Sequence, residues 1–166
     1  MLITELNKKA FDVLNNTFGY SSYRYEQEKI INSVLSGNHT LAIMPTGAGK
    51  SLCYQIPAII SSKKTVVISP LISLMDDQVS ALKECGIQAA KIHSDMTYDE
   101  RFSSWNNFKN GKEKIIYLSP EKIMSEDFLN QLKNLDVGLF VIDEIHCVSK
   151  WGHNFRPDYN QLSQLK

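Results

Sequence analysis

The sequence predicts an α/β fold in which a mainly parallel sheet is covered by helices on both faces. Five short apolar runs, each bounded by Gly, Pro, Ser or charged residues, occur at residues 40–44, 65–69, 89–93, 115–118 and 137–142. The gaps between the runs are long enough for helices, and strands that alternate with helices indicate a parallel sheet. Ligands bind such sheets at the carboxyl ends of the strands, so the polar residues that follow each run are the first candidates for a site.

Two helices are expected before the first apolar run. Thr4 can cap the first helix, which ends before Gly19, and the second runs over about residues 26–36 and ends at Gly37. A later helix is expected to begin at the capping-box pattern that joins Thr97 to Glu100.

The composition is that of one soluble globular domain. The 166 residues suit a single domain, and 43% hydrophobic residues exclude a disordered chain. No apolar run approaches the ~20 residues of a membrane span, and the N-terminus lacks the layout of a signal peptide. Three cysteines without a Cys-x-x-Cys pair argue against a disulfide framework or a zinc site. They favour a reduced compartment, such as the bacterial cytoplasm or nucleoid. Eighteen basic and eighteen acidic residues cancel, so any nucleic-acid site must be local.

A glycine-rich loop follows the first run and precedes an apolar helical run at residues 52–60. Glycines permit a tight turn whose N–H groups face phosphate oxygens, and the helix adds its positive end. Lys50 would reach the outer phosphates of ATP, and the Ser51 hydroxyl would bind Mg²⁺. A turn that binds nothing is the alternative interpretation. The residues expected to contact nucleotide are Thr46, Gly47, Ala48, Gly49, Lys50 and Ser51.

Two adjacent carboxylates, Asp143 and Glu144, end the last apolar run. In phosphoryl transfer the first carboxylate of such a pair holds Mg²⁺ and the second orients or activates the attacking water. A solvated helix cap is the alternative, because helix N-termini also attract acids. The loop 93 residues upstream favours the catalytic interpretation.

With both elements present, the chain resembles superfamily-two helicases and, among them, the RecQ family of DNA helicases. The resemblance runs from about Phe18 to Leu162. It is carried by the phosphate loop and its continuation, by the turns after later runs, by the DEAH-like acidic pair and by an aromatic loop: residues 44–58, 67–79, 119–121 and 143–159.

The resemblance implies a RecA-like P-loop fold with three layers. Residues 1–37 would hold N-terminal helices and an adenine-recognition segment, and residues 38–166 the first RecA-like ATP-binding domain. The implied activity is 3′–5′ DNA unwinding, driven by ATP and Mg²⁺, in recombination and repair. The implied partners are single-stranded and partly duplex DNA, with no membrane.

The resemblance also assigns roles to single residues. Tyr20 would stack on adenine, while Arg24 and Gln27 would bond the base. Lys50, Asp143 and Glu144 would be catalytic, with Ser51 and Asp143 holding Mg²⁺. Single-stranded DNA would contact two strand-end turns and the aromatic loop through Ser69, Pro70, Leu71, Ser119, Trp151, His153, Phe155 and Arg156. Plain surface loops, and packing of the aromatic side chains under their loop, are the alternatives.

By the same resemblance, the sequence lacks a second RecA-like domain with its arginine finger, a zinc-binding module and a winged helix. A fragment or a truncated gene product is therefore expected, without ATP turnover of its own. In the relatives, the strand after this point inserts between runs 40–44 and 137–142, so an unstable open sheet is expected. Two other functions stay open: a non-catalytic nucleotide- or DNA-binding module, and a P-loop ATPase outside the helicases.

Overall fold

The computed structural model describes residues 3–145 of the chain. These residues form two compact units, one that extends to Ser62 and one that begins at Lys63.

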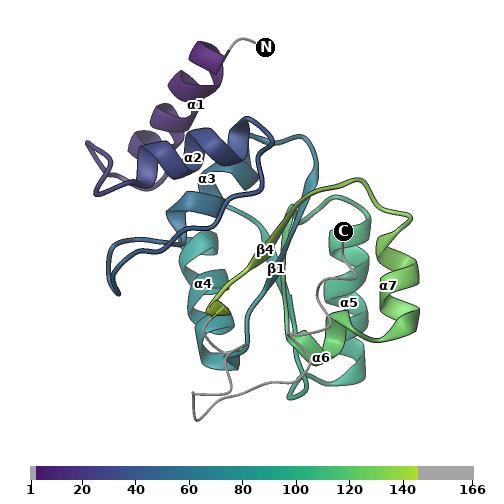
Figure 1. Cartoon of the computed structure of the whole chain (residues 1–166). Helices are drawn as coiled ribbons and strands as arrows, with labels where there is room; N and C mark the ends of the chain where they lie inside the picture. The colour runs from purple at the N-terminus through teal and green to yellow at the C-terminus, as the bar shows by residue number, and fades with distance from the viewer. Residues whose placement is uncertain (1–2, 146–166) are drawn as a thin grey trace. The chain divides into compact units, whose positions relative to one another are not determined.

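The first unit consists of three helices and the loops that join them (Figure 1). They are α1 (Ile3–Asn16), α2 (Gln27–Leu35) and α3 (Leu52–Ile60). Both α1 and α2 pack on α3. Their shared core consists of apolar residues at helical spacing, which are Ala10, Leu14, Ile31, Leu52 and Ile56.

All three helices follow the sequence pattern closely. Thr4 is the second residue of α1 rather than its cap, so the helix begins earlier than predicted by less than one turn. Gly37 directly follows the C-cap of α2 with a φ of 79°, a left-handed conformation that favours glycine. Gln27 is buried at the start of α2 although it is polar, because its side chain bonds to the glycine-rich loop.

The strand predicted at residues 40–44 is wrong, because the structure forms an irregular segment there. Leu41 and Ile43 are 71% and 88% exposed, and the segment has no strand partner among residues 3–145. A strand is stable only when its backbone groups have a neighbour, and an apolar run alone does not supply one.

The second unit contains a four-stranded, all-parallel sheet with the order β2-β3-β1-β4. Its strands are β1 (Lys64–Ile68), β2 (Ala89–Ile92), β3 (Ile115–Leu118) and β4 (Val137–Ile142), each within one residue of its predicted run. The connecting helices are α4 (Ile72–Glu84), α5 (Tyr98–Lys109), α6 (Pro120–Ile123) and α7 (Glu126–Leu132). The predicted α/β class is confirmed.

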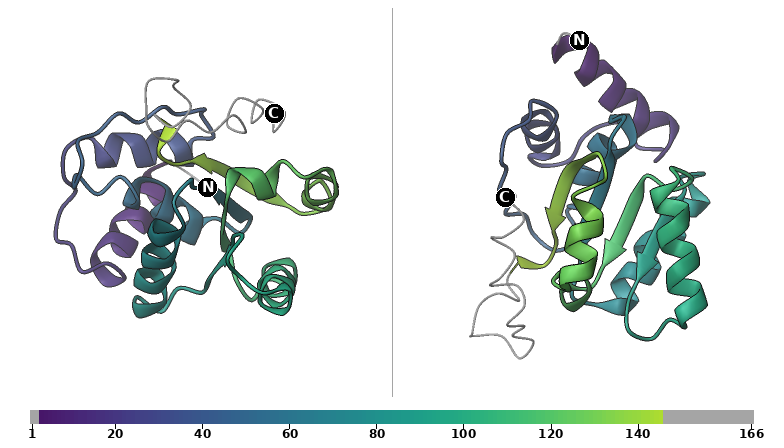
Figure 2. Two further views of the ribbon diagram at one scale, coloured as in Figure 1. Left: turned by 90° about the horizontal axis from the view of Figure 1, so that it is seen from below. Right: turned by 90° about the vertical axis from the view of Figure 1, so that its right-hand side faces the viewer.

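Helices cover the sheet on opposite faces: α4 lies on one side, and α5 and α7 lie on the other (Figures 1 and 2). Trp105, Phe108 and Phe128 fill the second layer against alternate residues of the strands, such as Val66 and Ile116. Within the described residues, β4 pairs only with β1, and Phe140 and Ile142 on it stay 39% and 38% exposed. The expected weakness of the open sheet stays a prediction.

Candidate functional site

The glycine-rich loop connects the exposed segment to α3. Gly47 and Gly49 have φ values of 79° and 74°, so both occupy the left-handed region that the predicted tight turn requires. Between them Ala48 is buried, while Thr46 is exposed. α3 begins directly after the loop, so the positive end of its dipole faces the loop. The N–H groups of Leu52, Cys53 and Tyr54 donate to the carbonyl oxygens of Gly49, Lys50 and Ser51, at 3.2, 3.0 and 3.2 Å.

Lys50 and Ser51 lie where the loop enters α3. The Lys50 ammonium donates to the Met44 carbonyl oxygen over 3.4 Å, a long bond that a phosphate oxygen could replace. Ser51 is the N-cap residue of α3, but its hydroxyl makes no capping bond. Both side chains are therefore suited to a nucleotide phosphate and its metal ion.

Gln27 holds the loop from α2. Its Nε2 donates to the carbonyl oxygens of Ala48 and Gly49, both at 3.1 Å, and its Oε1 accepts from the Arg24 N–H at 2.8 Å. A Cβ on Gly49 would lie only 2.6 Å from Nε2, so no side chain fits at that position without displacing the amide. The segment predicted to bind adenine thus lies directly on the loop predicted to bind phosphate.

A small cavity of about 60 Å³ lies between these elements, lined by Tyr20, Arg24, Gln27 and the loop. The Arg24 guanidinium lies 5.6 Å from the centre of the Tyr20 ring, which is 41% exposed. The Gln27 amide is engaged by the protein on both sides, so its bond to adenine stays a prediction. A cavity of this size encloses only part of a nucleotide. The glycine turn, the Lys50 ammonium and the Ser51 hydroxyl beside it are the groups that suit phosphates and their metal ion.

Cys53, in the first turn of α3, lies under the loop, with its Sγ 3.8 Å from the Met44 sulfur. Burial raises the pKa of this thiol to about 11. A thiol with such a pKa is protonated and unreactive near neutral pH. Cys53 is therefore a packing residue rather than a nucleophile.

The acidic pair follows β4. The Asp143 N–H donates to the Ile68 carbonyl oxygen at 2.9 Å, which continues the pairing of β1 and β4 beyond the last strand residue. Asp143 Oδ1 accepts the Glu144 N–H at 2.9 Å, and Glu144 has a φ of 51°, which is uncommon for a residue with a side chain. Such strained conformations concentrate at functional sites.

The predicted DNA-contacting turns lie beside the acidic pair. Ser69 and Pro70 follow β1, the neighbour of β4, and Ser119 follows β3, the next strand. The Ser69 N–H donates to the Leu118 carbonyl oxygen at 3.0 Å. Leu71 caps α4 and is 40% exposed. The structure therefore brings these turns and the carboxylates to one edge of the sheet.

The Ser69 hydroxyl is buried and has no hydrogen-bond partner in the described part of the chain. A buried polar group without a partner costs free energy, so an unpaired hydroxyl at a strand end favours a ligand there. The predicted residues of the aromatic loop, Trp151, His153, Phe155 and Arg156, lie outside the described residues.

His93 was not among the site residues predicted from the sequence. It is 7% exposed at the end of β2 and lines a large cavity beside α5. Tyr98 and Phe102 on α5 flank the same cavity. In the sequence, Tyr98 and Phe102 could have been noticed because two aromatic residues at i and i+4 lie on the same face of a mainly polar helix.

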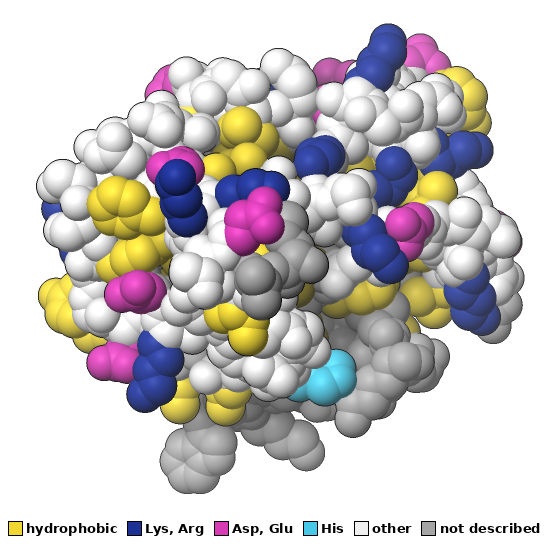
Figure 3. Space-filling model, turned by 90° about the horizontal axis from the view of Figure 1, so that it is seen from above, with side chains coloured by type: hydrophobic (Ala, Val, Ile, Leu, Met, Phe, Trp, Pro, Cys, Tyr) yellow, Lys and Arg dark blue, Asp and Glu magenta, His cyan; other side chains and the backbone are white. Residues whose placement is uncertain are grey.

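Three further observations concern the residues that the structure describes. None of their helices is long and apolar enough to cross a membrane. No group of three or more His, Cys, Asp or Glu side chains among residues 3–145 could hold a metal ion. On the face drawn in Figure 3, basic side chains are spread among acidic, hydrophobic and uncharged ones.

The comparisons with known proteins agree with this arrangement. The DEAD/DEAH box helicase family matches residues 24–166. The ATP-dependent DNA helicase RecQ of Pasteurella multocida is 48% identical over 97% of this chain and 26% of its own length. The RecQ of Bacillus subtilis is 47% identical over 95% of the chain and 27% of its length. The chain thus spans about a quarter of these relatives.

A solved structure supports the fold. A hypothetical ATP-dependent RNA helicase from Sulfolobus tokodaii aligns with a TM-score of 0.57 at 15% identity, over 95% of this chain and 54% of that one. The predicted resemblance to RecQ helicases is confirmed by the relatives. Because the family match covers most of the sequence, including the loop and the acidic pair, the chain belongs to the DEAD/DEAH box helicase family.

Proposed function

We propose that the chain is the ATP-binding and single-stranded-DNA-contacting part of a RecQ-like 3′–5′ DNA helicase. The intact protein would act in recombination and repair in the cytoplasm, with a second RecA-like domain that completes the motor. The relatives are named ATP-dependent DNA helicases, which supports ATP and DNA as the ligands.

One observation carries the proposal. Gln27, from the segment predicted to bind adenine, donates to the backbone of both Ala48 and Gly49 in the predicted phosphate loop. ATP presents its base and its phosphates within one small molecule, so residues for the two ends must lie close together. The Gln27 contacts provide that proximity inside one compact unit.

In this proposal each end of ATP has its own residues. Tyr20 stacks on adenine, and Arg24 and Gln27 bond the base. The loop N–H groups from Thr46 to Ser51 surround the phosphates, and Lys50 leaves the Met44 carbonyl for an outer phosphate oxygen. This exchange replaces a long bond to a neutral carbonyl oxygen with one to a negatively charged phosphate oxygen, so that donor and acceptor are both charged.

The acidic pair performs the chemistry. Asp143 and Ser51 would hold Mg²⁺, which neutralises phosphate charge when it is bound. Glu144 would accept the proton of the attacking water. The Glu144 N–H donates to Asp143 Oδ1, which ties the backbone of the second acidic residue to the carboxylate of the first.

DNA would contact the carboxyl edge of the sheet. The unpaired Ser69 hydroxyl and the turns at Pro70, Leu71 and Ser119 would bind the strand backbone, because hydroxyls and backbone N–H groups are common phosphate partners. The aromatic loop, with Trp151, His153, Phe155 and Arg156, would stack on bases and couple DNA binding to ATP hydrolysis.

Calorimetric titration of the 166-residue chain with ATP and Mg²⁺ tests the nucleotide site. Lys50→Ala should abolish measurable binding, since it removes the charge that faces the phosphates. Lys8→Ala, an exposed lysine on α1, is the matched control and should bind like the parent chain. Circular dichroism should show both variants folded. Equal affinities for the Lys50 and Lys8 variants would refute the loop assignment.

A further inference from the structure

A cavity of about 830 Å³ lies at the carboxyl ends of β2 and β3. Its wall comes from the ends of these strands, from one side of α5 and from α6 and α7, all within the second unit. The volume lies in the range of cavities that hold small organic ligands, roughly 300–1,000 Å³. The ATP residues proposed above do not line it, whereas the turn residues Pro70 and Ser119 do.

An aromatic platform lies at the cavity. The rings of Tyr98 and Phe102 are 6.1 Å apart and inclined by only 14°, so they are nearly parallel. They are 71% and 56% exposed, so folding buries little of either ring. Trp105, one turn further along α5, is buried and forms the cavity wall between them and Phe128. Exposed parallel rings of this kind are the surfaces on which unstacked bases of single strands pack.

The charged residues that line the cavity are mainly basic. Arg101, Lys109 and Lys122 contribute three positive charges and Glu121 one negative charge, although the whole chain is neutral. The Arg101 guanidinium is held in place by the carbonyl oxygens of Ser94 and Met96, at 3.3 and 2.8 Å. Lys109 forms no ion pair or hydrogen bond with any described residue. It is therefore available for an anion such as phosphate.

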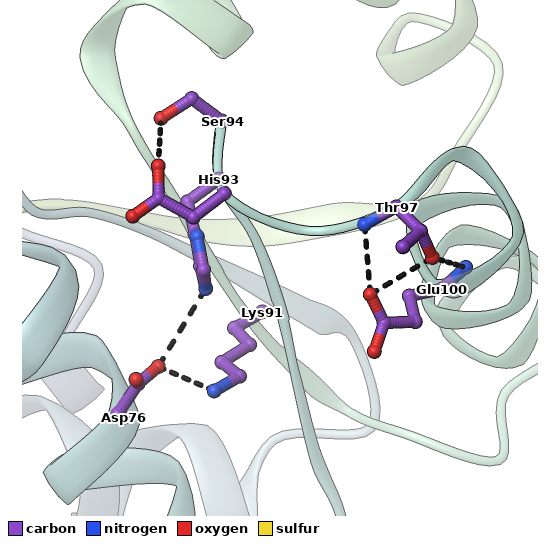
Figure 4. Close-up of polar contacts among 7 residues, drawn as sticks. Asp76, Lys91, His93, Ser94, Thr97 and Glu100 are labelled. Atoms are coloured by element: carbon purple, nitrogen blue, oxygen red, sulfur yellow. Dashed lines mark hydrogen bonds and ion pairs between the residues drawn. The ribbon is translucent and has the colours of Figure 1, made fainter.

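His93 contributes to the cavity lining, but its ring is directed elsewhere. It is 7% exposed, and its Nε2 lies 3.6 Å from Asp76 Oδ1 on α4, the helix that covers the opposite face of the sheet from α5 (Figure 4). Asp76 in turn pairs with Lys91. The imidazole is therefore directed toward Asp76, and the cavity offers a ligand its aromatic and basic side chains instead.

From the platform and the basic rim, we infer that this cavity holds one unstacked base of single-stranded DNA. The inference rests on the proposed function, because it adds a base subsite to the DNA-contacting edge. The base packs on Tyr98 and Phe102, and Lys109 meets a flanking phosphate. Aromatic surface and positive charge together fit a nucleotide better than an aliphatic peptide, which offers neither a flat ring nor a phosphate.

Binding of two short oligonucleotides to the 166-residue chain tests this subsite. One is oligothymidylate, and the other has the same phosphates but abasic residues. Phe102→Ala should weaken oligothymidylate binding at least about fivefold, the lower end of what one stacked base contributes. It should leave abasic binding unchanged. Phe11→Ala, which truncates a 42% exposed phenylalanine on α1, is the control and should change neither.

A second variant separates charge from stacking. Lys109→Ala should weaken both oligonucleotides and lower the slope of affinity against salt concentration by about one phosphate contact. An oligonucleotide that carries 5-iododeoxyuridine should form photocrosslinks at Tyr98, Phe102 or Trp105.

Each remaining outcome contradicts the inference. Equal oligothymidylate affinity of the Phe102 variant and the parent chain, or crosslinks only elsewhere, would overturn the subsite while leaving the DNA-binding function intact. An equal loss with the abasic strand would mean that Phe102 acts through folding rather than on a base. If the parent chain bound neither oligonucleotide, the subsite and the proposed DNA contact would both be wrong for this chain.

Discussion

Replacing Gly49 by alanine should damage the phosphate loop more than the same change at Gly47. Both residues have positive φ values, 74° and 79°, so an alanine at either position costs roughly 1–2 kcal/mol of backbone strain. The two positions differ in the room that the surrounding atoms leave for a side chain. A Cβ at Gly47 meets no atom within 4 Å, whereas a Cβ at Gly49 would lie 2.6 Å from Gln27 Nε2.

The clash at Gly49 has a second cost. To accommodate the methyl group, the Gln27 amide must move, and its two 3.1 Å bonds to the loop carbonyls weaken or break. Each such bond contributes about 0.5–1.5 kcal/mol net. Gly49→Ala should therefore destabilise the first unit by roughly 1–3 kcal/mol more than Gly47→Ala does.

Urea unfolding without nucleotide measures this difference in the free energy of unfolding. Hydrogen exchange of the α3 amides then measures the stability of the first unit, to which α3 belongs. Repeating both substitutions in a Gln27→Ala background isolates the clash. There the two alanines should cost the same, because the amide that causes the difference is gone. If Gly49→Ala were no worse than Gly47→Ala in the parent chain, or if its excess cost survived in the Gln27→Ala background, the packing of Gln27 on the loop would be refuted.

Two further predictions concern the capping box and the buried thiol. Thr97→Ala should lower the free energy of unfolding by about 1 kcal/mol at neutral pH, since the Thr97 hydroxyl caps α5. Hydrogen bonds from the Thr97 backbone and hydroxyl lower the pKa of Glu100 (Figure 4), so the stabilisation is present above the ordinary carboxyl pKa of 4.5 and is lost as the pH falls through the lowered value. The difference between urea melts of the variant and the parent should shrink at acidic pH without vanishing, because the Thr97 hydroxyl still accepts the Glu100 N–H there. A difference that does not change with pH would contradict the bond from the Thr97 hydroxyl to the Glu100 carboxylate. Because burial raises the pKa of Cys53 to about 11, a thiol reagent near neutral pH should label Cys85 well before Cys53, as read by peptide mass spectrometry. Equal labelling rates would contradict the burial of Cys53.

The parallel sheet could be predicted because its strands are buried on both faces and therefore appear as continuous apolar runs. β3 is the clearest case, with all four of its residues buried. The same criterion was wrong at residues 40–44, where Leu41 and Ile43 are exposed. An apolar run indicates that its side chains favour burial. Whether the run forms a strand also depends on a neighbouring strand that pairs with its backbone, and the residues of that strand lie far away in the sequence.

The candidate site shows the same division between local and distant information. The tight turn of the glycine-rich loop before α3 could be predicted because Gly47, Gly49, Lys50 and Ser51 are nearly contiguous in the sequence, whereas its binding of phosphate stays a prediction. The Gln27 bonds to that loop could not, because they join residues 21 and 22 positions apart. The burial of His93 beside Asp76 could not be predicted either, since a histidine beside a strand is compatible with either a buried or an exposed ring.

The strand order gives the two proposed ligands a direct structural connection. At the carboxyl edge, the Ser119 N–H donates to Ile92, the Ser69 N–H to Leu118 and the Asp143 N–H to Ile68. These bonds cross the whole sheet in the order β2, β3, β1 and β4, so the base cavity lies at one end of a backbone ladder and the acidic pair at the other. The bonds at Ser69 and Asp143 are 3.0 and 2.9 Å, whereas the bond at Ser119 is 3.4 Å. β1 is the direct neighbour of β4, whereas β3 and β1 separate β2 from β4. DNA bound at the Ser69 turn would therefore act on Asp143 more directly than a base held beside His93.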